Sequence, residues 1–189
     1  MDEVSAVKVT EQLKGAVVLD AETAWKRGYV TEVAINPADG TVLALLFRTP
    51  AGNEQAFAPE DFLLHKETKT VIGFGYPVSG QDELSQVLEK GVRASDEVVG
   101  SDVVTKDGRL LGRVTEILLQ TELMQVIYRV ESSGWRRLFG AGFYLAGNAP
   151  CAFSRVGARL IVPADARRQS AFRSLSESVK EWRQKRAAA

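Results

Sequence analysis

Apolar residues in this chain fall into short runs that are separated by turn-forming residues. Asn36-Pro37-Ala38-Asp39-Gly40 is a typical turn, because proline fixes φ and Asp-Gly supplies a left-handed position. Between such turns the β-branched content predicts strands, which we place at residues 7–9, 16–19, 28–35, 41–48 and 54–58. Residues 41–48 are apolar almost throughout, so that strand is expected to be buried on both faces. Short strands with closely spaced turns are typical of a small barrel or sandwich.

The same pattern occurs twice along the chain. Residues 10–19 (TEQLKGAVVL) match residues 95–104 (SDEVVGSDVV), and Gly28–Val33 matches Gly112–Ile117. Pro59–Phe62 has an expected counterpart in Pro150–Phe153, and the paired landmarks lie 84 to 91 residues apart. Such a period is too long for a solenoid unit and suits a small domain present in two copies. Two copies of one fold with few reactive side chains favour a binding protein over an enzyme.

The repeat divides the chain into four parts. We expect copy 1 at residues 7–78, a helical connector at 79–94, copy 2 at 95–163 and a C-terminal segment at 164–189. The connector is predicted to be a helix over Gly80–Gly91, capped by Ser79 and carrying an apolar stripe. In copy 2, Lys106-Asp107-Gly108 between apolar segments predicts a hairpin.

The C-terminal segment has the spacing of an amphipathic helix. Phe172, Leu175, Val179 and Trp182 fall on one helical face, and residues 164–189 hold seven basic and three acidic side chains, a net charge of +4. Three alternatives stay open for this face: packing on the protein's own barrels, docking in a groove of a partner, or weak peripheral contact with an anionic membrane.

A second candidate interaction site is the loop Trp135–Phe143. The connection from Tyr128 to Phe143 that contains it is five residues longer than the connection from Phe47 to Phe57 in copy 1. Trp and Arg dominate the energetics of protein interfaces, so an exposed connection of this composition is typical of an anchor. The alternative is that its apolar residues cover an open barrel end or the seam between the copies. The candidate partner-binding residues here are Trp135, Arg136, Arg137 and Phe139.

Composition narrows the possible chemistry. The 24 basic and 24 acidic residues cancel, so the chain has no global basic field, and we do not expect direct contact with nucleic acid. One cysteine and one histidine cannot supply a typical zinc site or a disulfide. We expect Cys151 to be a small buried apolar residue and His65 to lie at the edge of a turn. No catalytic residue, cofactor or metal is therefore predicted.

The expected location is the cytoplasm. The N-terminus is acidic and lacks the order of a signal peptide, and the longest apolar run, Val42–Phe47, is too short to span a bilayer.

Residues 99–117 (VGSDVVTKDGRLLGRVTEI) resemble the opening of a PRC-barrel domain. This module occurs in the cytoplasmic part of the H subunit of the photosynthetic reaction centre and in the C-terminal half of a bacterial ribosome maturation factor. The resemblance covers nearly all of copy 2 and, more loosely, copy 1. It implies a compact barrel of about six strands that docks on other macromolecules and has no catalytic residues.

The repeated segments Gly28–Val33 and Gly112–Ile117 also have a structural interpretation. Gly28 and Gly112 are expected where a strand bends or another backbone comes close. Val30 and Val114 should point inward, whereas Glu32 and Glu116 either face solvent or cap a neighbouring loop.

The fold class expected from these observations is mainly β: two small PRC-type, SH3-like barrels in tandem, a short connecting helix and a C-terminal amphipathic helix. The expected function is that of a non-catalytic adaptor that docks onto a larger protein complex. The alternative is an accessory factor of ribosome assembly or RNA processing. Against that alternative, the two copies are alike, whereas the ribosome maturation factor pairs its PRC-barrel with a different domain.

Overall fold

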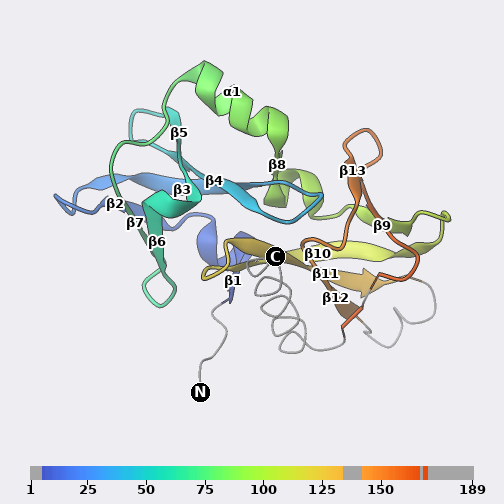
Figure 1. Ribbon diagram of the computed structural model, residues 1–189. Coiled ribbons are helices and arrows are strands. Elements are labelled where there is room, and N and C mark those ends of the chain that lie inside the picture. Colours follow the sequence, from blue (N-terminus) through green and yellow to red (C-terminus); the bar gives the residue numbers. More distant parts are fainter. Residues whose placement is uncertain (1–5, 134–141, 167, 170–189) are drawn as a thin grey trace, which may run out of the picture.

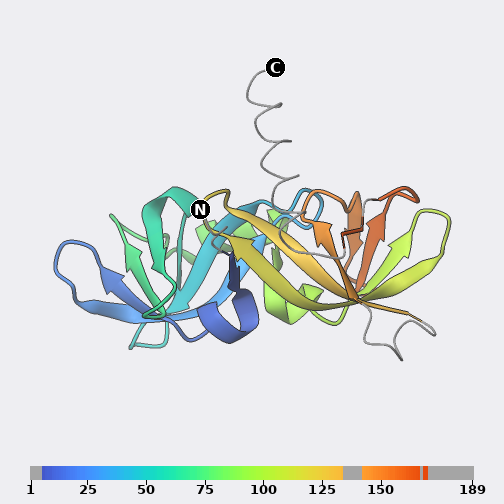
Figure 2. The ribbon, with the colours of Figure 1, turned by 90° about the horizontal axis from the view of Figure 1, so that it is seen from below.

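The computed structural model describes residues 6–133, 142–166 and 168–169 of the chain. These residues form a mainly β structure with two seven-stranded sheets and few helices. Figures 1 and 2 show the sheets side by side, the first half of the chain in one and most of the second half in the other. The expected β-rich fold is thus confirmed, while closure of each sheet into a barrel stays a prediction.

The first sheet contains six strands from the first half of the chain, in the order β5-β4-β3-β2-β7-β6. They are β2 (Val17–Asp20), β3 (Lys26–Ile35), β4 (Val42–Arg48), β5 (Glu54–Phe57), β6 (Phe62–His65) and β7 (Thr70–Gly73). Only the pair β2–β7 is parallel within this order. A short 3-10 turn, η2 (Pro59–Asp61), connects the two end strands β5 and β6.

The second sheet repeats this order strand for strand, as β12-β11-β10-β9-β14-β13, and its one parallel pair is β9–β14. The strands are β9 (Asp102–Thr105), β10 (Leu110–Gln120), β11 (Gln125–Ser132), β12 (Gly142–Ala146), β13 (Ala152–Ser154) and β14 (Arg159–Val162). The predicted Lys-Asp-Gly hairpin is confirmed between β9 and β10, with Gly108 at a φ of 85°.

Each sheet receives its seventh strand from the segment that precedes the other half. β1 (Ala6–Lys8) pairs with β10, and β8 (Val92–Arg93) pairs with β3. A five-residue π-helical turn follows each of these strands, η1 (Val9–Leu13) after β1 and η3 (Ala94–Val98) after β8. The halves therefore exchange their leading strands, and this pairing crosses the boundaries expected between the copies.

A hydrogen-bonded contact between equivalent residues marks a local two-fold relation between the sheets. Thr41, the residue before β4, forms an antiparallel bridge with Gln125 at the start of β11. The amide of Val42 donates to the carbonyl of Met124 at 3.0 Å, and the amide of Val126 donates to the carbonyl of Gly40 at 2.9 Å. Thr41 and Gln125 are 84 positions apart, as are Gly28 and Gly112. The two hairpins thus meet through the same residues of each copy.

Glu32 fixes the exchanged segment on the first sheet. Its side chain is fully buried and accepts hydrogen bonds from the amides of Ser95 and Asp96 in η3, at 3.2 and 3.1 Å, and from the hydroxyl of Ser95. Lys14 lies 3.9 Å from the same carboxylate. Of the two sequence-based alternatives, capping of a neighbouring segment is therefore correct for Glu32.

Glu116 makes the equivalent contact in the second sheet with fewer partners. Its carboxylate accepts a hydrogen bond of 2.6 Å from the hydroxyl of Thr10 in η1 and lies 3.8 Å from Lys8. The side chain is 8% exposed. The repeated glutamate therefore holds the other half's leading segment in both sheets.

The hydrophobic core is continuous between the sheets. One cluster of buried side chains includes Val30 and Leu45 from the first sheet and Val114 and Tyr128 from the second. The expectation that Val30 and Val114 point inward is confirmed. Close backbone approach is confirmed at Gly28 and Gly112 too: an added Cβ would lie 2.1 Å from the Arg48 carbonyl oxygen and 2.0 Å from that of Glu131, respectively.

The connector contains the helix α1 (Gln81–Lys90), which covers the outer face of the first sheet (Figure 1). Leu84 packs there in a second cluster with Ala34, Ala44, Leu46 and Ala56. The predicted burial of strand β4 on both faces is confirmed, because Leu45 and Leu46 point into different clusters. The cap expected at Ser79 is wrong: Gly80 is the N-cap, and no side chain caps the helix.

One sequence match between the halves needs a shift of register. In the first sheet, Leu64 pairs with Val71, which pairs with Val18 on its other side. In the second sheet, Phe153 pairs with Leu160, which pairs with Val103, the equivalent of Val18. Phe153 is therefore the counterpart of Leu64, and the expected match of Phe153 to Phe62 is wrong. The expected match aligned the two halves on Pro59 and Pro150. The register of the strands is set by their pairing, which is not evident from the sequence.

Candidate functional site

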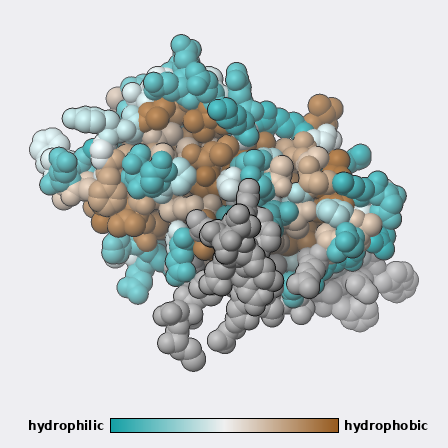
Figure 3. Space-filling view, in the orientation of Figure 1, coloured by the Kyte–Doolittle hydropathy of each residue, from teal (hydrophilic) through white to brown (hydrophobic). Residues whose placement is uncertain are grey.

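The first half carries a row of apolar side chains on the outer face of β6, β7 and β2. Leu63 pairs with Ile72, and Ile72 pairs with Leu19. Side chains at paired positions share one face of a sheet, and Leu63 is 57% exposed. Apolar surface gathers over this part of the molecule in Figure 3.

Two exposed aromatic residues lie close to this row along the backbone. Phe74 follows Ile72 by two positions and is 40% exposed. Trp25, in the connection from β2 to β3, is 79% exposed, and its carbonyl accepts a hydrogen bond of 2.8 Å from the amide of Asp20. We call the three residues of this row and the two neighbouring aromatic residues the outer apolar surface: Leu19, Trp25, Leu63, Ile72 and Phe74.

The backbone around the outer apolar surface is held by polar contacts. The carboxylate of Asp20 accepts hydrogen bonds from the amides of Glu22 and Thr23, at 3.0 and 2.8 Å, and forms an ion pair with Arg27. The Thr23 amide, followed by Arg27, holds the pKa of Asp20 well below its ordinary value. Arg27 also donates to the carbonyl of Gly75 at 2.8 Å, which connects the segments that carry Trp25 and Phe74. The surface is therefore preorganised.

The second half lacks large apolar side chains at three of the equivalent positions. Arg109 takes the position of Trp25. The carbonyl of Arg109 accepts a hydrogen bond from the amide of Thr105, just as the carbonyl of Trp25 accepts one from the amide of Asp20. Ala152 pairs with Ile161 as Leu63 pairs with Ile72. Pro163, two residues beyond Ile161, takes the position of Phe74. The two sheets thus share a frame and differ in what they expose.

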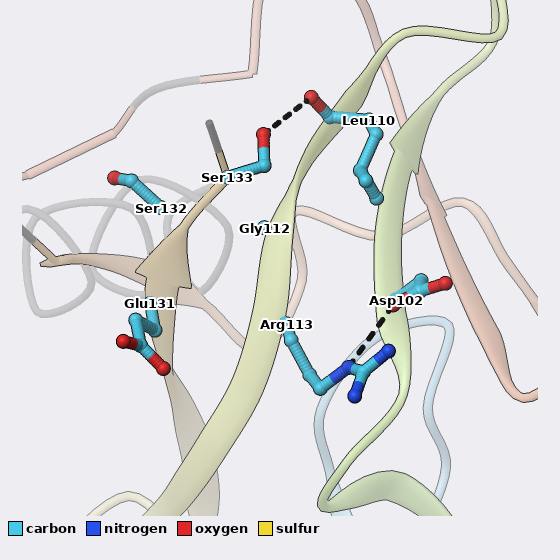
Figure 4. Close-up of a pocket in the computed structure, with 7 residues that line it drawn as sticks. All are labelled: Asp102, Leu110, Gly112, Arg113, Glu131, Ser132 and Ser133. Carbon is cyan, nitrogen blue, oxygen red and sulfur yellow. Dashed lines mark hydrogen bonds and ion pairs between the residues drawn. The ribbon is translucent and has the colours of Figure 1, made fainter. Parts of the chain in front are cut away.

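The second half has a pocket of about 280 Å³ beside the start of β10 (Figure 4), where the pairing of β10 with β9 shifts register. Arg113 forms an ion pair of 3.2 Å with Asp102, and the hydroxyl of Ser133 donates to the carbonyl of Leu110 at 3.1 Å. Gly112 forms part of the wall, and the other lining residues are Glu131 and Ser132.

The pocket offers hydrogen-bonding groups without an activated nucleophile. A serine nucleophile needs a base within hydrogen-bond reach, and Ser133 instead donates to a backbone carbonyl. The chain's one histidine, His65, ends β6 in the other half. The pocket's lining can form polar contacts with a ligand or a side chain.

Metal binding has no support in the described residues, which contain no group of three or more His, Cys, Asp or Glu placed to hold an ion. The expectation for Cys151 is wrong, because this residue is exposed. It lies at the edge of the sheet before β13, where its thiol donates to the carbonyl of Ile161 at 3.3 Å. Proline at position 150 and the apolar residues around it suggested burial, whereas the position faces outward.

The residues predicted as partner-binding lie outside the described part of the chain. This holds for Trp135, Arg136, Arg137 and Phe139, and equally for Phe172, Leu175, Val179 and Trp182. Phe143, at the end of the longer connection, is described and is 8% exposed within the common core. Within the described residues, no helix combines the length and the apolar character needed to cross a membrane.

The sequence-based search missed the outer apolar surface. Its signal was present: Trp25 lies in a polar turn segment and Phe74 stands between two glycines. Aromatic residues in such segments have few neighbours in the chain to bury them, but their exposure became evident only from the strand pairing.

Comparison of the sequence with models of known protein families gives no match, and comparison with curated proteins gives none either.

Proposed function

We propose that this protein is a non-catalytic, cytoplasmic adaptor, built from two PRC-type barrels, that docks onto a larger protein complex through the outer apolar surface of its first half. The resemblance of residues 99–117 to PRC-barrel domains supports this proposal, as does the six-strand order that occurs in both halves.

The observation that carries the proposal is the difference between the two outer faces. The second half forms the same sheet with Arg109, Ala152 and Pro163 where the first half exposes Trp25, Leu63 and Phe74. The fold therefore does not require large apolar residues at these positions. Exposed apolar surface of this kind is typical of protein interaction sites, and Trp is enriched among residues that dominate binding energy.

The test exchanges the exposed residues for those that the second half carries. The double variant Trp25→Arg, Leu63→Ala and the wild type serve as full-length bait in native lysate, with and without nuclease treatment. Val156→Ala is the matched control, since Val156 is fully exposed in the second half. Because the altered side chains are exposed, we expect the double variant to change the free energy of unfolding by less than about 1 kcal/mol.

The expected result is capture of one defined protein complex by the wild type and by Val156→Ala, and loss of that capture in the double variant. Equal capture by all three proteins would contradict the assigned surface. Capture of ribosomal proteins that disappears with nuclease would instead favour the accessory factor of ribosome assembly.

A further inference from the structure

The chain leaves both sheets by the same route. After β7, Val78 forms an antiparallel bridge with Ala56 of β5, with N–O distances of 2.8 and 2.9 Å. After β14, Gln169 forms the same bridge with Tyr144 of β12, with distances of 3.1 and 2.8 Å. Ala56 pairs with Leu46, and Tyr144 pairs with Arg129, at equivalent places in the two sheets. Val78 and Gln169 therefore occupy equivalent positions.

In the first half, the residues after this bridge form α1. Leu84, six residues beyond Val78, packs on the outer face of β3, β4 and β5, and Leu88, ten residues beyond it, packs against the same cluster. Ser85, next to Leu84, is exposed.

Counting from Gln169 places the same residue types at the same distances. Leu175 lies six residues beyond Gln169 and Val179 ten residues beyond it, while Ser176 corresponds to Ser85. Leu175 and Val179 both belong to the apolar stripe predicted from the sequence. The C-terminal segment therefore carries the apolar pattern with which α1 covers the first sheet.

Two of the positions that α1 covers in the first sheet are also aliphatic in the second, while Arg129 takes the place of Leu46. Leu118 pairs with Ile127 in the second sheet at the place where Ala34 pairs with Ala44 in the first. Ile127 is fully buried, yet among the described residues it belongs to neither hydrophobic cluster. Its burial on an outward-facing position indicates that this face has an occupant.

We propose that residues 170–182 dock on the outer face of β10, β11 and β12 in the way that α1 docks on the first sheet. The occupant is the chain's own C-terminal segment, joined to the face directly through the Gln169 bridge. This inference does not depend on the proposed adaptor function, because the contact lies within one molecule and away from the outer apolar surface.

Disulfide trapping in the full-length protein tests this contact. In a Cys151→Ser background, Arg129→Cys is combined with Leu175→Cys, which reproduces the positions of Leu46 and Leu84. The control pairs Arg129→Cys with Ser176→Cys, whose counterpart Ser85 faces away from the first sheet. A disulfide needs close Cα atoms and converging side chains, so we expect the first pair to oxidise roughly tenfold faster than the control.

The disulfide must form within one chain, at a rate that does not depend on protein concentration. Equal rates for the two pairs, or a disulfide that forms only between molecules, would overturn the proposal and favour a partner or a second copy on this face. Hydrogen exchange of unmodified protein gives an independent measurement. We expect amides of residues 172–182 to be protected in the wild type and unprotected in Leu175→Asp, Val179→Asp, and a lack of protection in the wild type would also overturn the proposal.

Discussion

The two halves of this protein have the same strand order and differ at their surfaces. Trp25, Leu63 and Phe74 are exposed in the first half, and Arg109, Ala152 and Pro163 replace them in the second. The residues that hold the halves together occur in both copies, as with Glu32 and Glu116. Repetition within one chain therefore separates the residues that the frame requires from those that it does not, and the latter are the candidates for function.

The largest expected effect concerns the repeated glutamates. Glu32→Ala removes the acceptor of two amides and one hydroxyl in η3, and buried donors without a partner are costly. We expect a loss of about 4 kcal/mol in the free energy of unfolding. Glu116→Ala removes one hydroxyl contact and should cost about 1 kcal/mol. Denaturant unfolding of both variants measures the difference. Equal losses in the free energy of unfolding would contradict the larger contribution expected of Glu32.

The outer faces differ at one central position. Leu46 is fully buried under α1, whereas its counterpart Arg129 is exposed. Leu46→Ala should therefore lower the free energy of unfolding by about 3 kcal/mol, and Arg129→Ala should change it by less than about 0.5 kcal/mol. Thermal and denaturant unfolding test this pair. A loss above 2 kcal/mol in Arg129→Ala, roughly the lower bound for burying a large side chain, would contradict the exposed position.

A buried hydroxyl distinguishes the cores. Tyr128 takes the place of Leu45, and its hydroxyl has no hydrogen-bond partner among the described residues. We expect Tyr128→Phe to raise the free energy of unfolding by about 1 kcal/mol at neutral pH, because the unpaired polar group is removed. Tyr76→Phe, at a fully exposed residue, is the control and should have no effect.

The same residue gives a pH dependence. Burial raises the pKa of Tyr128 above its ordinary value, so the folded protein keeps the proton while the unfolded chain ionises near pH 10. Stability is then complete below about pH 10 and falls as the pH rises, by up to about 1.4 kcal/mol per unit. Unfolding measured between pH 9 and 11 should show this slope in the wild type and a flatter one in Tyr128→Phe. Equal slopes would contradict the burial of a protonated hydroxyl.

The smallest effect concerns the turns that join β2 to β3 and β9 to β10. The hydrogen bond from the Thr23 amide is the largest of the contacts that lower the pKa of Asp20. The hydrogen bond with the Thr105 hydroxyl is the largest of those that lower the pKa of Asp107. A lowered pKa adds stability above the ordinary value of about 3.9, which is lost as the pH falls. In carbon-detected NMR titrations, Thr105→Val should move the Asp107 midpoint towards its ordinary value. Thr23→Val should move the Asp20 midpoint only in part, because the Thr23 amide and Arg27 remain, and a full return would contradict this set of contacts.

The sequence predicted the elements better than their partners. Turn chemistry at Asn36–Gly40 and Lys106–Gly108 placed the hairpins, and the apolar run at Val42–Phe47 correctly indicated burial on both faces. The exchange of β1 and β8 was not predicted, because a three-residue strand has the same pattern whichever sheet it joins. The pairing of β1 with β10 depends on contacts between residues more than 100 positions apart.

The candidate site could not be found from local pattern for a similar reason. Trp25, Leu63 and Phe74 are spread over nearly 50 positions of sequence, and the pairing of β2, β6 and β7 brings Leu63 and Ile72 beside Leu19. Residue type alone predicted aromatic anchors at Trp135 and Trp182, which lie outside the described residues. Exposure, which decides whether an apolar residue is core or interface, follows only from the assembled sheets.

Strand exchange should make the two halves a single folding unit, and native-state hydrogen exchange with mass spectrometry tests this most directly. Amides of β3 and β4 report on the first sheet, and those of β10 and β11 on the second, as denaturant is added to the full-length protein. We predict that both sets open with the same free energy and the same denaturant dependence. Opening of one sheet while the other stays protected would show two independent domains and contradict the interlocked frame.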